Sequence, residues 1–227
     1  MKARAALLCL SLASAGCGPQ AIDVRSPFSF SAEQARAALK QQMPPALLAA
    51  VGGALPEQWP ADAPRLLVDL LVIGRARVEL EAVGADPSRF AALRLRAARA
   101  TTGGPVGLIQ PPPGELLLFA GPLGATSLSD PGVRRLARGA FPVAGTQIDC
   151  TPPPCPPLTT DGGAALEVSQ ALGLEPAARG ALEELVLGAG AFELLLALRV
   201  PIDSAADPLA PRGAAAVEVG LDLELAP

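Results

Sequence analysis

Prolines and glycines interrupt this chain so often that they constrain its fold more than any other feature. There are 25 prolines and 23 glycines among the 227 residues. Proline removes a backbone donor and clashes with the preceding helical turn, and glycine weakens a helix interior, so this density disfavours long helices. Short strands joined by turns accept both residue types at their ends. The composition therefore favours a β-rich fold.

Two neighbouring segments have the pattern of strands. Residues 66–73 are almost all apolar, as in a strand covered on both faces, and residues 75–82 then alternate between apolar and polar. Residues 84–88 contain Gly, Asp, Pro and Ser, which favour a turn, and residues 90–98 then alternate again. Folding these runs into a hairpin would place Glu79 opposite Arg94 on the solvent face, where opposite charges attract. The alternation of acidic and basic residues indicates a solvated sheet face rather than a basic binding patch.

Further elements follow from the same periodicities. Ser31 and Gln34 have the spacing of a capping box, and apolar residues then recur at helical intervals, which predicts a helix over residues 31–42. Asp130 followed by Pro131 predicts a capped helical turn over residues 130–139. The other expected helices cover residues 46–50 and 175–187, and the other expected strands cover residues 106–110, 115–120, 141–149, 164–174, 191–200 and 214–225.

These elements predict a mainly β protein. The number and length of the strands favour a β-sandwich or a partly open barrel, with a short N-terminal helix against one end. The alternative is an α+β domain with one curved antiparallel sheet. A single domain over residues 31–227 fits the length and the lack of a clear linker after Ser31. Residues 17–30 are expected to form a tether in front of that domain.

The first 16 residues have the three parts of an export signal. Lys2 and Arg4 supply positive charge, residues 5–13 form an apolar core, and small residues lead up to Cys17. The core is too short to cross a bilayer, which takes roughly 20 apolar residues. The segment Ala13-Ser14-Ala15-Gly16-Cys17 resembles the lipobox of bacterial lipoproteins, with Ser14 in the place where such boxes usually carry Leu.

The resemblance implies that a signal peptide of residues 1–16 is removed and that Cys17 becomes an acylated N-terminus carrying chains such as palmitate. Gly18, where Asp would favour retention at the inner membrane, points by the same resemblance to an outer-membrane lipoprotein facing the periplasm or the exterior. Membrane anchoring through this lipid is then expected. The alternative is ordinary cleavage after Ala15, which would release a soluble protein.

The four cysteines bear on this choice. Cys9 leaves with the leader in both cases. Ordinary cleavage leaves three cysteines, and therefore one unpaired thiol in an oxidising compartment. Lipidation uses Cys17 and leaves Cys150 and Cys155 to form a structural disulfide bond that closes a proline-rich loop. The cysteine count therefore favours the lipoprotein.

Missing residue types exclude several kinds of chemistry. The chain has no His, which removes Ser-His-Asp and Cys-His catalysis and most transition-metal sites, and it has no glycine-rich phosphate loop. After removal of the leader, 16 basic residues face 22 acidic ones, so nucleic acid is not an expected partner. No cofactor is expected. Asp203 and Asp207 lie in a polar segment and are weak candidates for a calcium site, because that ion prefers oxygen ligands.

Taken together, these features predict a lipid-anchored, non-enzymatic envelope protein with a structural or protein-interaction role. The expected partners are the membrane, through the N-terminal lipid, and an envelope protein. The alternative is a carrier or sensor of an apolar ligand such as a lipid, held in a cavity lined by Leu, Val and Ala. A third possibility is a hydrolase that uses paired carboxylates. Trp59, in a proline-bounded loop, is expected to plug an edge of the core rather than to stack on a ligand.

Overall fold

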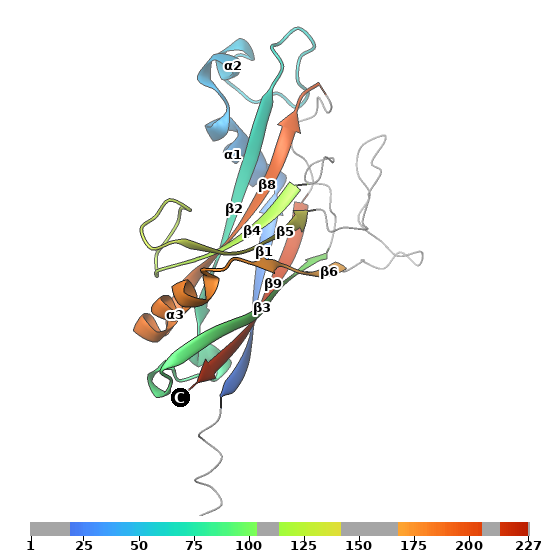
Figure 1. Ribbon diagram of the computed structural model, residues 1–227. Helices are drawn as coiled ribbons and strands as arrows, with labels where there is room; N and C mark the ends of the chain where they lie inside the picture. The colour runs from blue at the N-terminus through green and yellow to red at the C-terminus, as the bar shows by residue number, and fades with distance from the viewer. Residues whose placement is uncertain (1–18, 104–113, 142–167, 206–213, 227) are drawn as a thin grey trace, which may run out of the picture.

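The computed structural model describes residues 19–103, 114–141, 168–205 and 214–226. These residues form two antiparallel sheets that pack as a β-sandwich, with short helices near its ends (Figure 1). The prediction of a mainly β sandwich is confirmed. The alternative of a single curved sheet is wrong.

The first sheet contains four strands in the order β1-β9-β3-β6, and the second contains five in the order β2-β8-β4-β5-β7. The strands of the first sheet are β1 (Gln20–Ser31), β9 (Ala214–Ala226), β3 (Ala92–Gly103) and β6 (Val168–Ala171). The strands of the second sheet are β2 (Leu67–Glu79), β8 (Ala191–Asp203), β4 (Gly114–Gly121), β5 (Arg134–Phe141) and β7 (Gly173–Leu174). The helices are α1 (Ala32–Gln42), α2 (Pro45–Ala50) and α3 (Ala178–Ala189), and the 3-10 turns η1 (Glu81–Val83) and η2 (Pro87–Arg89) join β2 to β3.

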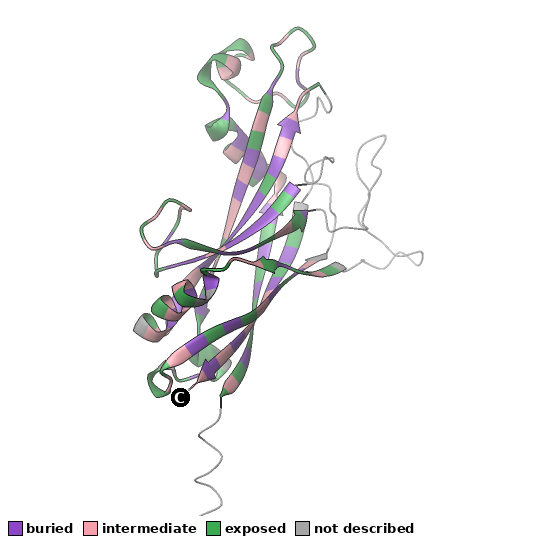
Figure 2. Ribbon diagram, viewed as in Figure 1, coloured by how far each residue is buried: buried purple, intermediate pink, exposed green. Residues whose placement is uncertain are grey.

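Alternating side chains build the core between the two sheets (Figure 2). In β9 every second residue from Val217 to Leu225 is at most 1% exposed, because successive side chains of a strand point to opposite faces. Phe30 of β1 and Phe192 of β8 are the largest fully buried side chains, and they face the core from opposite sheets. The inner faces of both sheets therefore form one continuous apolar layer.

The segment that begins the domain is an edge strand, so the predicted tether is wrong over most of its length. All of β1 pairs with β9, and every second residue from Ile22 to Phe30 is buried. Pro27 is tolerated because β1 has no partner on its other side, where a missing amide breaks no ladder bond. The domain therefore begins at Gln20 rather than at Ser31.

The predicted hairpin between residues 66–82 and 90–98 is also wrong. β2 pairs with β8, and β3 pairs with β9 and β6, so the two segments belong to different sheets. Glu79 lies opposite Ala191 and forms an ion pair with Arg77 at 2.8 Å, while Arg94 lies opposite Glu224. The turns η1 and η2 carry the chain from one sheet to the other.

Three predicted helices are confirmed and one is wrong. The helix expected over residues 46–50 is α2. In α1 both hydrogen bonds of the capping box between Ser31 and Gln34 are present. The predicted helix over residues 175–187 corresponds to α3, which ends at Gly190 in the left-handed conformation that glycine adopts readily. Residues 134–141, expected to be helical in part, form β5 instead.

The remaining strand predictions have mixed outcomes. The segments 115–120, 191–200 and 214–225 are confirmed as β4, β8 and β9. Segment 164–174 contains the two short strands β6 and β7. The predicted strand 106–110, and all of 141–149 except its first residue, lie outside the described residues.

The sandwich is held together along its two long sides in different ways. On one side, the rings of Phe28 and Phe30 in β1 lie over Gly74 in β2, so closely that a Cβ there would stand 3.0 Å from Phe28 Cδ1. On the other side, the chain passes from β6 in one sheet to β7 in the other through the buried Leu172. Close packing at Gly74 and a shared connection at Leu172 therefore join the sheets.

The free edge of β2 is occupied near its middle by α1. The Gln42 side chain donates from Nε2 to the Leu71 carbonyl at 2.7 Å and accepts from the Leu71 amide at 2.9 Å through Oε1. Both backbone groups of Leu71 are thus bonded to a single side-chain amide.

The outer face of the five-stranded sheet carries a second, smaller apolar cluster. Leu195, in the middle of β8, is fully buried on this face. It is covered by residues 122–133, which connect β4 to β5 and contribute Ala125 and Val133 to the cluster. β8 is therefore buried on both of its faces.

The two ends of the sandwich carry different elements (Figure 1). Gln20 pairs with Leu225, so the start of β1 and the end of β9 lie side by side at one end, together with η1 and η2. α2 and the loop that follows it lie at the opposite end, as does the C-terminal end of β8.

Candidate functional site

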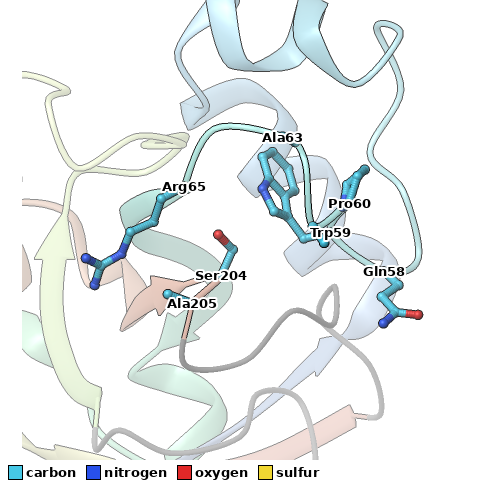
Figure 3. Close-up of a pocket in the computed structure, with 8 residues that line it drawn as sticks. Gln58, Trp59, Pro60, Ala63, Arg65, Ser204 and Ala205 are labelled. Atoms are coloured by element: carbon cyan, nitrogen blue, oxygen red, sulfur yellow. The ribbon is translucent and has the colours of Figure 1, made fainter.

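A pocket of about 550 Å³ opens at the end of the sandwich that carries α2 (Figure 3). One wall comes from the loop between α2 and β2, and the other from the residues at the end of β8 and just after it. The lining residues are Gln58, Trp59, Pro60, Ala61, Ala63, Arg65, Ser204 and Ala205.

Trp59 fixes the first wall. Its side chain is only 8% exposed and belongs to the core cluster, which confirms the prediction that it plugs an edge of the core. The indole Nε1 donates to the Pro64 carbonyl at 3.0 Å, so its one polar group is satisfied while the ring packs. The loop is tightened further by a hydrogen bond from the Ala63 amide to the Pro60 carbonyl. The tryptophan thus serves the fold and lines the pocket at once.

Arg65 and Asp203 form the charged part of the site. The Arg65 guanidinium donates from Nε to Asp203 Oδ1 at 2.8 Å and from Nη2 to Asp203 Oδ2, a two-bond geometry that suits arginine and carboxylate. The Ala205 amide adds a bond to Asp203 Oδ1 at 3.0 Å. The hydrogen bonds from Arg65 and Ala205 lower the pKa of Asp203 to about 2, and the same contact raises the pKa of Arg65.

Ser204 connects the two walls through hydrogen bonds to the backbone of Leu66. Its hydroxyl accepts from the Leu66 amide at 2.9 Å, and its own amide donates to the Leu66 carbonyl at 2.9 Å. The loop that carries Trp59 is therefore held to the end of β8 by the residues that directly follow Arg65 and Asp203. The pocket is a preformed depression between two fixed walls.

The chemistry of this arrangement favours binding. The Asp203 carboxylate stays ionised at ordinary pH and is held by Arg65, so it is poorly suited to accept or deliver a proton near neutrality. Among the described lining residues, only Ser204 has a hydroxyl group that could act as a nucleophile. None of the others has a basic side chain that could take up its proton. The Gln58 amide and the Arg65–Asp203 ion pair offer hydrogen bonds to a ligand instead, while the indole packs into the core behind them.

Of the predicted site residues, only Asp203 lies in the described part of the chain. Asp203 is the last residue of β8 and is engaged by Arg65, while Asp207 lies outside the described residues. Among the residues that the structure describes, no group of three or more acidic or cysteine side chains could hold a metal ion. The calcium site stays a prediction. Cys17, Cys150 and Cys155 also lie outside the described residues, so the lipid and the disulfide stay predictions too.

Sequence reasoning did not single out Arg65 or Ser204. Arg65 and Asp203 are 138 positions apart, and they meet only because Leu67 in β2 pairs with Asp203 in β8. Nothing in the local pattern of either segment indicates that pairing. The available signal was the loop itself, which combines the single tryptophan with several prolines.

Comparisons with known proteins add little. No family model matches the chain, and no curated protein matches it. A solved structure titled Desmodium yellow mottle tymovirus is 13% identical and covers 75% of this chain and 91% of its own, with a TM-score of 0.21. A likeness at that level carries no argument about fold or function. Within the described part of the chain, no helix has the length and apolar character needed to cross a membrane.

Proposed function

We propose that the protein is a lipid-anchored, non-enzymatic component of the bacterial envelope, located at the outer membrane, with a structural or protein-interaction role. The observation that supports it most is the position of β1, which begins at Gln20, three residues after Cys17. Cleavage before Cys17 would therefore remove none of the described elements. An acyl group on Cys17 would leave the whole described sandwich outside the membrane.

The charged residues on the sheet surfaces support a non-enzymatic role. Many of them are paired: Arg99 with Asp222 at 2.8 Å in the first sheet, and Arg199 with Asp69 at 2.6 Å in the second. Such pairs occupy the carboxylates with neighbouring arginines in solvent, which is typical of a sheet surface. Together with the engaged Asp203, they leave the paired-carboxylate hydrolase with little support.

The Trp59 pocket fits a protein or peptide contact better than it fits a lipid. A lipid carrier needs an aliphatic cavity, whereas the described residues that line this pocket are one tryptophan, small residues and polar ones, with no Leu or Val among them. Arginine is also among the residue types that most often anchor protein interfaces, and the Arg65 side chain is exposed. The carrier of an apolar ligand is therefore the weaker alternative.

The experiment that tests the anchor is metabolic labelling with a palmitate analogue in a Gram-negative host. The wild-type chain and a Cys9→Ser variant should take up label, because Cys9 leaves with the leader. A Cys17→Ser variant should not. Label retained by Cys17→Ser, or lost from Cys9→Ser alone, would overturn the assignment of Cys17.

Membrane fractionation of the same cells tests the location. The labelled wild-type chain should appear with the outer membrane, and a Gly18→Asp variant should shift towards the inner membrane while keeping its label. A wild-type chain found in the inner membrane would contradict the outer-membrane assignment without affecting the anchor itself.

A further inference from the structure

The segment of chain between the proposed anchor and the fold is short. Gly18 and Pro19 alone stand between Cys17 and the first residue of β1. Three residue steps span at most about 10 Å even when fully extended. Gln20 is already paired with Leu225 of β9, so it belongs to the rigid sheet. A lipid on Cys17 would therefore hold one particular end of the sandwich close to the bilayer.

That end is formed by a few connected segments. The β2–β3 connection, residues 80–91, lies here with the start of β1 and the end of β9 (Figure 1). It is tied down by backbone bonds from the Leu80 amide to the Gly190 carbonyl at 3.1 Å and from the Ala91 amide to the Ala226 carbonyl at 3.0 Å. The end therefore presents a defined surface.

Charge at this end is compatible with a lipid surface. Residues 80–91 carry two acidic side chains, Glu81 and Asp86, and one basic side chain, Arg89, and all three are exposed. The mature chain as a whole has six more acidic than basic residues, 22 against 16, and anionic lipids repel negative charge. With a single excess acidic residue, the β2–β3 connection carries little of that negative charge, and such a surface repels it only weakly.

The Trp59 pocket lies at the far end of the same sheets. β1 has 12 residues and runs from the anchored end to α1, which separates the two ends by roughly 40 Å at 3.3 Å per residue. The strand axis thus sets the direction in which the pocket faces once Cys17 is held.

We propose that residues 80–91 and the end of β9 rest on the headgroup surface of the membrane, so that the Trp59 pocket opens away from it towards the surrounding compartment. This inference rests on the proposed function, because it requires the lipid on Cys17. It adds an orientation and a membrane contact surface.

Headgroup quenching tests the orientation on the full chain. The lipidated protein, produced with its leader, is reconstituted in vesicles of phosphatidylethanolamine and phosphatidylglycerol. A thiol-reactive fluorophore is placed at Ser88→Cys in one sample and at Gln58→Cys in another, both positions being exposed. The chain without either substitution, treated identically, gives the background from native cysteines. A lipid with a nitroxide headgroup should quench position 88 severalfold more than position 58.

Equal quenching at the two positions, or stronger quenching at position 58, would overturn the orientation. Mass spectrometry of the N-terminal peptide from the same samples separates the two proposals. An unlipidated peptide would overturn the anchor and the orientation together, whereas a lipidated peptide with equal quenching would overturn the orientation alone.

A linker variant tests the cause. Inserting 20 residues of Gly and Ser between Gly18 and Pro19 adds a chain with a mean span of about 25 Å. Quenching at position 88 should then fall towards that at position 58, with the acyl group still present. Unchanged quenching would show that the short connection does not set the orientation, and would overturn that argument.

Discussion

The outer faces of the two sheets differ in how far they are covered. The four-stranded sheet exposes charged side chains that pair between strands, as Arg96 does with Glu224 through Nε at 2.9 Å. The five-stranded sheet buries part of its outer face, where Leu195 is fully covered by the β4–β5 connection. Both sheets are antiparallel and both contribute to the same core.

The difference shows that burial of a strand depends on what covers it. β9 alternates strictly because its outer face meets solvent, whereas β8 is apolar on both faces around Leu195, where its outer face meets a loop. The sequence patterns of the two strands therefore record their surroundings. Substitutions on the two outer faces should then have very different consequences.

The largest effect is expected at Leu195. Leu195→Ala should lower the free energy of unfolding by about 2–5 kcal/mol, as for a core leucine, because it leaves a cavity beneath the covering loop. Ser29→Ala, on the exposed outer face of β1, should change it by less than about 0.5 kcal/mol. Urea denaturation of the two variants measures the contrast. Similar small losses would mean that the outer face of β8 is no second core.

Gly74 tests how the sheets meet at their edges. Gly74→Val should destabilise by about 1–3 kcal/mol, because the added atoms press on the rings of Phe28 and Phe30. Gly220→Val in β9 is the matched control, since the nearest atom to a Cβ there is Asp23 Oδ1 at 4.0 Å. That variant should be neutral or slightly more stable in the same denaturation assay. A tolerated Gly74→Val would contradict close packing between the sheet edges.

Ser26 gives a smaller effect with the opposite sign. It is 4% exposed on the inner face of β1, and its hydroxyl has no hydrogen-bond partner among the described residues. Ser26→Ala should raise the free energy of unfolding by up to about 1 kcal/mol, because it removes an unsatisfied buried group. Ser31→Ala, which removes the cap of α1, should instead lower it by about 1 kcal/mol. A loss of stability in Ser26→Ala would indicate a partner for that hydroxyl.

The smallest effect concerns the loop that covers Leu195. Asp130 accepts hydrogen bonds from the amides of Thr126 at 2.7 Å and Ser127 at 2.9 Å, which lower its pKa below the usual 3.8. A carboxylate with a lowered pKa stabilises the fold above its usual pKa and loses that contribution as the pH falls. Protection of the two amides against hydrogen exchange, measured by NMR and corrected for the intrinsic rates, should therefore decrease as the pH drops below 3.8.

Asp130→Asn should show faster exchange of the same amides at neutral pH than the wild-type chain does, after correction for intrinsic rates. Protection that persists unchanged in this variant would mean that the loop is held by its apolar contacts alone.

The sequence predicted the elements better than their partners. The alternation in residues 214–225, the apolar run around residues 191–200 and the capping box at Ser31 are local patterns, and each formed the expected element. Which strand lies beside which is not local. β2 and β3 have the same alternation and a short connection, and a hairpin satisfies both, yet each pairs with a strand from the C-terminal half.

Two elements were missed because a local signal had a second interpretation. Residues 17–30 were expected to be a tether, although the alternation through β1 is complete. Pro27 does not prevent a strand there, because β1 is an edge strand. Asp130-Pro131 suggested the start of a helix. The Asp130 carboxylate instead accepts hydrogen bonds from the amides of Thr126 and Ser127, earlier in the chain, and closes a turn. The Trp59 pocket was predictable only in part, since its second wall arrives from β8.

The side-chain amide of Gln42 bears on how neighbouring copies of the protein would interact on a membrane. In the proposed anchored state, neighbouring copies would share one orientation and present the same edge of β2 at the same height above the bilayer. Edge strands brought together in this way are prone to join into continuous sheets. Gln42 already holds the backbone of Leu71 near the middle of that edge, so an approaching strand would first have to displace it. If the anchor is present, this side chain of α1 would therefore hinder pairing between the β2 edges of neighbouring copies.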